Sequence, residues 1–129
     1  MKKGFIVDIE KETLENDSYR KVLYTSNYSQ LVVMSIEPGD EIGEEVHGLD
    51  QFIRFEEGKG KVVLGAVEHE IEGDWAVVIP AGVKHNVINN GTGQLKLYSV
   101  YSPPGHKDDT IHHTKEDEKE EHYDGSTSE

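Results

Sequence analysis

The sequence predicts an all-β domain, either a sandwich or a barrel of short strands. Between residues 5 and 101, short apolar or alternating runs follow one another, and Gly, Asn and Pro residues separate them. This many short strands in about a hundred residues is typical of a sandwich or barrel. The runs occupy residues 4–9, 19–25, 30–36, 44–47, 51–55, 60–65, 67–72, 75–80, 83–89 and 95–101. One weak helix is expected, over residues 11–17.

Composition narrows the class of protein. A chain of 129 residues is long enough for one domain with its own core. It contains no cysteine, which excludes disulfides and thiolate metal sites, and no apolar run long enough for a signal peptide or a membrane span. A net charge of −13 argues against nucleic-acid or anionic-membrane partners, because phosphate binding depends on Lys and Arg. We therefore expect a soluble cytoplasmic protein.

The C-terminal part differs from the rest. Residues 103–129 carry nine acidic side chains and three lysines, which is −6 of the net −13. Pro103-Pro104-Gly105 ends the last apolar run, and few apolar residues follow. We expect a β-barrel over residues 1–102 and an acidic extension over 103–129. Its first part, to residue 114, is expected to be at least partly ordered, and 115–129 to be a frayed helix or a disordered, solvated tail.

Polar side chains interrupt the strands in the stretch EEVHGLDQFIRF, residues 44–55. Because successive side chains of a strand point to opposite faces, Glu45 and His47 share one face. After an irregularity at Gly48-Leu49, Gln51 shares the inner face with the apolar residues Ile53 and Phe55. Glu44 is expected to face outward.

A second polar residue, His85, lies between Val83 and Val87 on one face of a later run. Taken alone, such a histidine is more often a satisfied core residue than a ligand. Together, Glu45, His47, Gln51 and His85 offer two imidazoles, a carboxylate and an amide oxygen. This set suits one divalent metal ion such as Fe, Mn, Ni, Co or Zn. The alternative is that Glu45 bends outward at the rim and that both histidines only form hydrogen bonds.

The two stretches resemble the signature motifs of the cupin superfamily of small β-barrels. In the first motif Gly39 and Gly58 match the glycines, Glu45 and His47 stand at the two histidine positions, and Gln51 stands at the glutamate position. The second motif is matched, with one extra residue after its first glycine, by Gly73, Pro80, Gly82, His85 and Asn89. The resemblance covers about residues 5–101. It implies an antiparallel cupin-type β-barrel, also described as a double-stranded β-helix or jelly roll.

The departures from the family pattern concern the ligands. The usual set is three histidines and one glutamate, whereas here the single carboxylate has moved to the first histidine position. A site that no longer bound metal would be free to lose its buried carboxylate. The retained charge therefore favours metal binding, with a lower affinity than a site with three histidines.

Resemblance to small single-domain cupins implies two enzymatic functions and one alternative. The enzymatic ones are isomerisation of a sugar or sugar phosphate and dioxygenase-type oxidation of a small chelating molecule. The alternative is a non-enzymatic module that binds or senses a small ligand. The acidic surface argues against a sugar phosphate as the substrate. No catalytic residue can be named from the sequence.

Other residues carry weaker signals. The resemblance implies a homodimer that pairs through exchanged N-terminal strands, which we place at residues 3–9 and at the outward face near Phe52 and Arg54. His69 is expected to be partly buried and ordinary. Surface positions are expected for His106, His112 and His113, although one of them could reach the mouth of the barrel. Core or interface positions are expected for Phe52, Trp75, Tyr98 and Tyr101.

Overall fold

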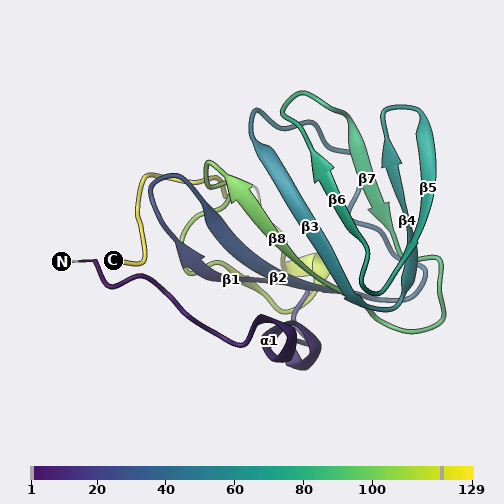
Figure 1. Cartoon of the computed structure of the whole chain (residues 1–129), viewed down its shortest axis with the longest axis horizontal. Helices are drawn as coiled ribbons and strands as arrows, with labels where there is room; N and C mark the ends of the chain where they lie inside the picture. The colour runs from purple at the N-terminus through teal and green to yellow at the C-terminus, as the bar shows by residue number, and fades with distance from the viewer. Residues whose placement is uncertain (1, 120) are drawn as a thin grey trace.

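The computed structural model of the protein describes residues 2–119 and 121–129. Strands are its main regular elements (Figure 1). In chain order the elements are α1 (Ile9–Glu15), β1 (Arg20–Thr25), β2 (Gln30–Ile36), β3 (Asp50–Glu57), β4 (Lys59–Leu64), β5 (Val67–Glu72), β6 (Ala76–Ile79), β7 (His85–Ile88), β8 (Leu95–Ser102), β9 (Ile111–His112) and the 3-10 helix η1 (Lys115–Asp117). The predicted all-β class is confirmed.

The strands pair into two antiparallel sheets. One has six strands in the order β6-β3-β8-β2-β1-β9, and the other has three in the order β5-β4-β7. Isolated antiparallel bridges at Glu41–Ile88 and Glu45–His85 attach the segment before β3 to β7. Among the described residues the ladders do not close into a continuous barrel. The jelly-roll arrangement is therefore that of two facing sheets.

The core fills the space between the sheets. On β3 the side chains of Ile53 and Phe55 are fully buried, and Leu95 and Leu97 on β8 are equally inaccessible. These residues follow the period-2 alternation of a strand with one buried face. Gln51 and Tyr101 continue the same inner rows and are also buried. The two rows thus carry polar groups into one end of the core.

A glycine shapes the connection between the two sheets. Gly58 lies between β3 and β4 with a φ of +100°, a region that L side chains rarely adopt. A Cβ at this position would lie 2.5 Å from the carbonyl oxygen of Gln94. The first motif ends in a glycine because another backbone approaches closely there.

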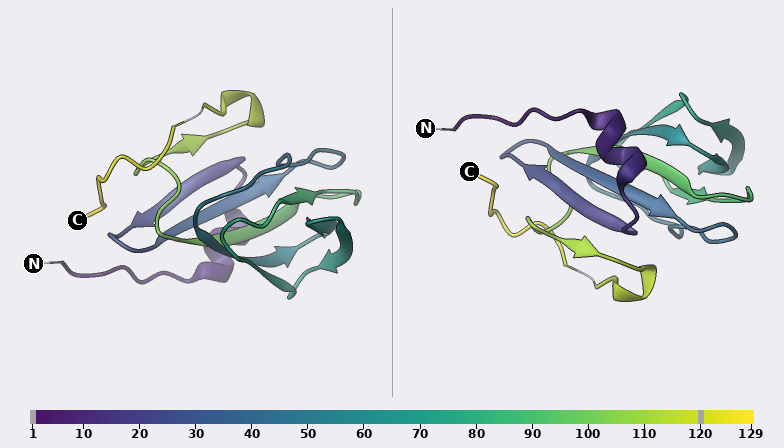
Figure 2. Two further views of the ribbon diagram at one scale, coloured as in Figure 1. Left: turned by 90° about the horizontal axis from the view of Figure 1, so that it is seen from above. Right: turned by 90° about the horizontal axis from the view of Figure 1, so that it is seen from below.

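The N-terminal segment differs from the expectation. Residues 4–9 do not form the predicted strand, and α1 begins two residues before the expected helix. Asp8 caps it, accepting a hydrogen bond from the backbone N–H of Lys11 at 3.2 Å. In Figure 2 this helix and the C-terminal segment lie on opposite sides of the strands.

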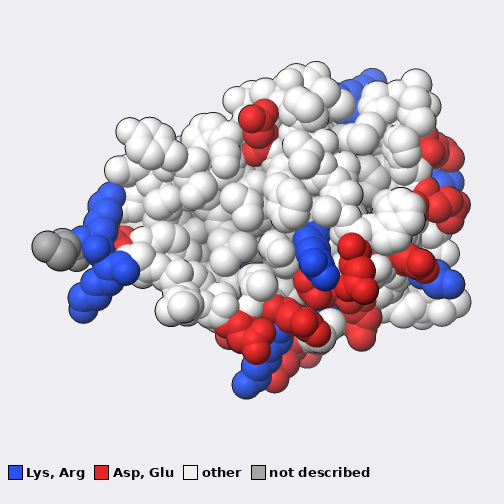
Figure 3. Space-filling view, in the orientation of Figure 1, with Lys and Arg blue, Asp and Glu red and all other residues white. Residues whose placement is uncertain are grey.

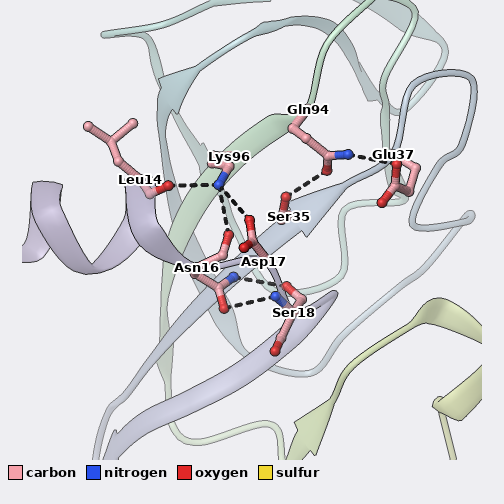
Figure 4. A network of polar contacts seen from close by, with 8 residues as sticks. All are labelled: Leu14, Asn16, Asp17, Ser18, Ser35, Glu37, Gln94 and Lys96. Carbon is pink, nitrogen blue, oxygen red and sulfur yellow. Dashed lines mark hydrogen bonds and ion pairs between the residues drawn. The ribbon is translucent and has the colours of Figure 1, made fainter.

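A buried lysine attaches α1 to the sheet (Figure 4). Lys96 lies on the outer side of β8 and is 7% exposed. Its Nζ donates to the carbonyl oxygens of Leu14 at 2.7 Å and Asn16 at 3.0 Å, and to a carboxylate oxygen of Asp17 at 3.2 Å. The ammonium group therefore satisfies acceptors at the C-terminal end of the helix.

The residues after Ser102 return to the strands. β9 pairs with β1 and extends the edge of the six-stranded sheet. The backbone N–H of Ser128 donates to the carbonyl oxygen of Thr25 at 2.9 Å, and Glu129 accepts from the backbone N–H groups of Lys3 and Gly4 at 2.6 and 2.9 Å. Both ends of the chain accordingly lie side by side in Figure 1. The division of the chain at residue 102 stays a prediction.

Acidic side chains gather along the lower edge of the face in Figure 3, while much of its upper left part is uncharged. Within the described residues, no helix is long and apolar enough to cross a membrane.

Candidate metal centre

The segment between β2 and β3 carries Glu45 and His47 to the edge of β7. The backbone N–H of Glu45 donates to the carbonyl oxygen of His85 at 2.9 Å, and the reverse bond is also 2.9 Å. Strand-like alternation follows from this pairing: Glu44 and Val46 are exposed, whereas Glu45 and His47 are half-buried. The predicted orientation of Glu44 and Glu45 is confirmed.

The three side chains converge. One potential ligand atom from each of Glu45, His47 and His85 lies within 4.8 Å of the others. The Nε2 atom of His47 is 3.7 Å from Oε2 of Glu45, and the rings of His47 and His85 have centroids 5.1 Å apart. The structure therefore contains a His/Glu cluster that could hold a metal ion.

His85 is oriented by a backbone contact. The side chain is 4% exposed, and its Nδ1 is 2.9 Å from the carbonyl oxygen of Val83. Because a carbonyl can only accept, Nδ1 carries a proton, so Nε2 is the ring nitrogen that can act as a metal ligand. This Nε2 is buried and has no hydrogen-bond partner among the described residues.

Gln51 is also buried and incompletely satisfied. Its Nε2 donates to Oγ of Ser99 at 3.3 Å, while its Oε1 has no partner within the described part of the chain. In the strand register Gln51 is opposite Tyr101, whose ring centroid is 6.5 Å from that of His47. Gln51 thus faces inward as predicted, and its role as a ligand stays a prediction.

The electrostatic surroundings favour the ionised form of Glu45. Burial would raise the pKa of this carboxyl, but the close approach and charge of His47, together with Arg20 and His85, outweigh burial and lower the pKa below its usual value. Glu45 is an anion at neutral pH, which is the form that binds a metal.

A cavity of about 670 Å³ opens beside Glu45 and His47. It is formed by the segment before β3, the end of β8 and the C-terminal extension. Its lining residues are Arg20, Glu45, Val46, His47, Gly48, Leu49, Tyr101, Pro103, Pro104, Gly105, His106, Glu118, Lys119, Glu121, His122 and Tyr123. The extension therefore forms part of the candidate site.

The structure corrects the expectations for His112 and His69, and for His106 it bears out the alternative that a histidine after the strands reaches the mouth of the site. His106 is not a plain surface residue, because it lines the cavity with its ring centroid 5.1 Å from that of Tyr101. His112 is buried at 6% exposure, and His69 is exposed instead of partly buried. Tyr101 is a wall residue of the site as well as a core residue.

Sequence reasoning missed Arg20. The signal was present, because Arg20 alternates with the buried residue Val22 on β1 and therefore faces inward. Nothing in the local sequence indicated that Glu118 would lie beside it. That contact joins residues 98 positions apart.

Comparisons with known proteins agree with this fold. Residues 32–101 match the family model of the cupin domain. The crystal structure of BH2720 from Bacillus halodurans has a TM-score of 0.87 and 45% identity, over 89% of this chain and 92% of that one. The uncharacterized protein YrkC of Bacillus subtilis is 43% identical over 122 residues, and the uncharacterized protein L612 of Acanthamoeba polyphaga mimivirus is 41% identical over 107.

The all-β fold and the match to the cupin domain model make this a cupin-type protein. The chain belongs to the cupin family. It covers 66% of the length of YrkC and 67% of L612, and these matches take in 89% and 79% of this chain.

Proposed function

We propose that the protein binds one divalent first-row metal ion through Glu45, His47 and His85, with the amide oxygen of Gln51 as a fourth ligand. The observation that carries the proposal is the buried Nε2 of His85, which has no hydrogen-bond partner among the described residues. A buried polar atom without a partner costs about 1–3 kcal/mol, so a native structure that retains one calls for an explanation.

The donor set fits a metal in two further respects. Oε1 of Gln51 is a second buried acceptor with no partner in the described residues. The contact from Nδ1 of His85 to a backbone carbonyl is the support that metal-binding histidines usually have, since it fixes ring orientation and tautomer. Two imidazoles with oxygen donors suit Fe, Mn, Ni, Co or Zn.

A metal bound there would polarise a carbonyl or hydroxyl group of a ligand and lower the pKa of bound water. The residues of the chain would position that ligand. Burial raises the pKa of Tyr101 to about 12, and burial followed by the charge of Arg20 lowers the pKa of His106 to about 3. Both groups are therefore uncharged at neutral pH and offer polar contacts in the cavity wall.

The cavity volume of about 670 Å³ suits a small-molecule ligand, because it falls within the roughly 300–1,000 Å³ of typical small-ligand sites. The proposed metal ligands and the polar groups of the wall favour a polar or chelating molecule. We propose a metal-dependent enzyme of isomerase or dioxygenase type. The alternative is a ligand-binding or sensing cupin without turnover. Aerobic assays of the iron-loaded protein with chelating diols and keto acids separate the two, since only the enzyme consumes its ligand.

Elemental analysis tests the metal itself. Protein purified without added metal should contain a stoichiometric amount of one of the five metals, or take one up on reconstitution. His85→Ala should abolish stoichiometric binding, while His69→Ala, at an exposed position on β5, should not. Less than about a tenth of an equivalent of every transition metal, before and after reconstitution, would overturn the proposal.

A cytoplasmic location is part of the proposal, and the absence of cysteine supports it.

We also propose that the protein forms a homodimer. Residues 2–8 belong to no strand, and in this segment Phe5 is 46% and Ile6 97% exposed. On the outer face, Phe52 pairs in register with Val78, which is 63% exposed. Such apolar groups are typical of a surface that another subunit covers. Light scattering at micromolar concentration should give twice the chain mass, and the mass of one chain would refute the dimer.

A further inference from the structure

Arg20 is a buried cation in the wall of the cavity. The residue is 3% exposed, and its guanidinium carbon lies 5.2 Å from the ring centroid of Tyr19. Nη1 donates to Oε2 of Glu118 at 2.7 Å and lies 3.3 Å from Nδ1 of His112. The Nε group has no hydrogen-bond partner in the part of the chain that the structure describes.

A buried guanidinium requires an anion. Removing a charge from water is costly unless a counter-charge and hydrogen bonds replace the solvent. The carboxylate of Glu118 supplies the counter-charge, although its own side chain is 38% exposed and it engages only Nη1. Arg20 therefore retains unused capacity for an anion, because a guanidinium can bind a carboxylate through two parallel hydrogen bonds.

The same cavity connects Arg20 with the candidate metal centre. Glu45 and His47 line it together with Arg20, and the charge of Arg20 contributes to the lowered pKa of Glu45. A small molecule in this space can present one end to the metal ligands and the other to the guanidinium.

We propose that Arg20 binds the carboxylate of a small organic acid in this cavity, and that Glu118 occupies this position until the ligand displaces it. The metal end of the ligand rests on the proposed function. Its chemical class is a small carboxylic acid that carries a second oxygen group, a hydroxyl or a carbonyl, able to reach the metal.

The surroundings of Glu118 allow this exchange without unfolding the extension. Lys115, three residues earlier, donates from Nζ to the carbonyl oxygen of Glu41 at 2.6 Å and to Oδ1 of Asp40 at 3.1 Å. After it, the backbone N–H of Tyr123 donates to the carbonyl oxygen of Gly105 at 3.3 Å. The backbone is thus held on both sides of Glu118, and its partly exposed side chain can leave Arg20 by rotation alone.

Acetate binding to the EDTA-treated protein tests the carboxylate position independently of any metal. The readout is the ¹H–¹⁵N resonance of the Arg20 Nε–H group, identified by its loss in Arg20→Lys, at constant ionic strength. Acetate should shift this resonance, and acetamide should not. Glu118→Gln removes the competing carboxylate, so acetate affinity should rise about tenfold, as expected for loss of one charge-assisted hydrogen bond.

The matched control is Glu116→Gln, which removes the same charge from an exposed residue of the same segment. It should change acetate affinity less than about twofold, because Glu116 forms no hydrogen bond or ion pair with Arg20 among the described residues and its exposed charge is screened by salt. Equal acetate affinity in the wild type, Glu118→Gln and Glu116→Gln would overturn the inference. So would acetate binding that leaves the Arg20 Nε–H resonance unshifted. If Arg20→Lys does not fold, the acetate affinities of Glu118→Gln and Glu116→Gln still test whether Glu118 competes with acetate for Arg20. Acetate binding without metal uptake would refute the proposed function alone.

Discussion

Replacing Glu45 by Gln removes the one carboxylate of the His/Glu cluster and keeps the size of the side chain. Glu44→Gln makes the same chemical change one residue earlier. Glu44 forms an ion pair with Lys84 at 2.9 Å, and these side chains are 61% and 60% exposed. Glu45 is half-buried and lies 3.7 Å from His47. The two variants therefore test whether strand alternation directs Glu45 alone to a metal.

The expected difference is large. Loss of a residue that merely supports a metal ligand typically weakens metal binding by about 10–100-fold. Loss of a direct anionic ligand should cost at least as much, which corresponds to about 1.4–2.7 kcal/mol or more of binding free energy. Glu44→Gln should leave metal affinity unchanged within about twofold and lower the free energy of unfolding by less than about 1 kcal/mol, as is usual for an exposed ion pair.

Isothermal titration of the metal-free proteins with Zn and Mn measures both affinities, and thermal unfolding without metal confirms that each variant is folded. The reasoning predicts weaker binding in Glu45→Gln alone. Equal affinities for the two variants would refute it, and the segment 44–47 would then be a solvated rim of the cavity.

Three further variants test the site and its scaffold. Gln51→Glu should tighten binding of Mn or Zn and lower the unfolding temperature of the metal-free protein, because two carboxylates would share one pocket; a higher metal-free unfolding temperature would contradict this. Gly58→Ala should lower the free energy of unfolding in urea by more than about 2 kcal/mol, because a positive φ is combined with a clash against the backbone of Gln94. Gly65→Ala, where φ is +61° and the space around the Cβ is open, should lower it by about 1 kcal/mol. Lys96→Met should lower the free energy of unfolding by about 2–4 kcal/mol in the same assay, because carbonyls at the end of α1 lose their buried donor. The control is Lys61→Met, which removes an ion pair with Glu68, a side chain that is 63% exposed, and should lower it by less than about 1 kcal/mol. Similar losses in the two variants would show that the Lys96 contacts contribute little.

The all-β fold class could be predicted from the sequence because it depends on local patterns. Alternation over residues 51–55 placed Ile53 and Phe55 inside, and the turn residues between runs marked the strand ends. The same alternation separated Glu45 from Glu44. Alternation failed at residues 4–9, where the apolar residues have no neighbouring strand among the described residues to pair with, since a strand needs a partner that its own sequence does not specify.

The sequence by itself determined which residue types face inward, and so it supplied Glu45, His47, Gln51 and His85 as candidates. Only the tertiary structure decided which of them meet, through the backbone bridge between Glu45 and His85 and the carbonyl that orients the His85 ring. It also brought Glu118 onto Arg20 and His106 into the cavity wall. These contacts join residues far apart in the chain, and their geometry depends on how the two sheets and the C-terminal extension pack, which no local pattern of side chains encodes.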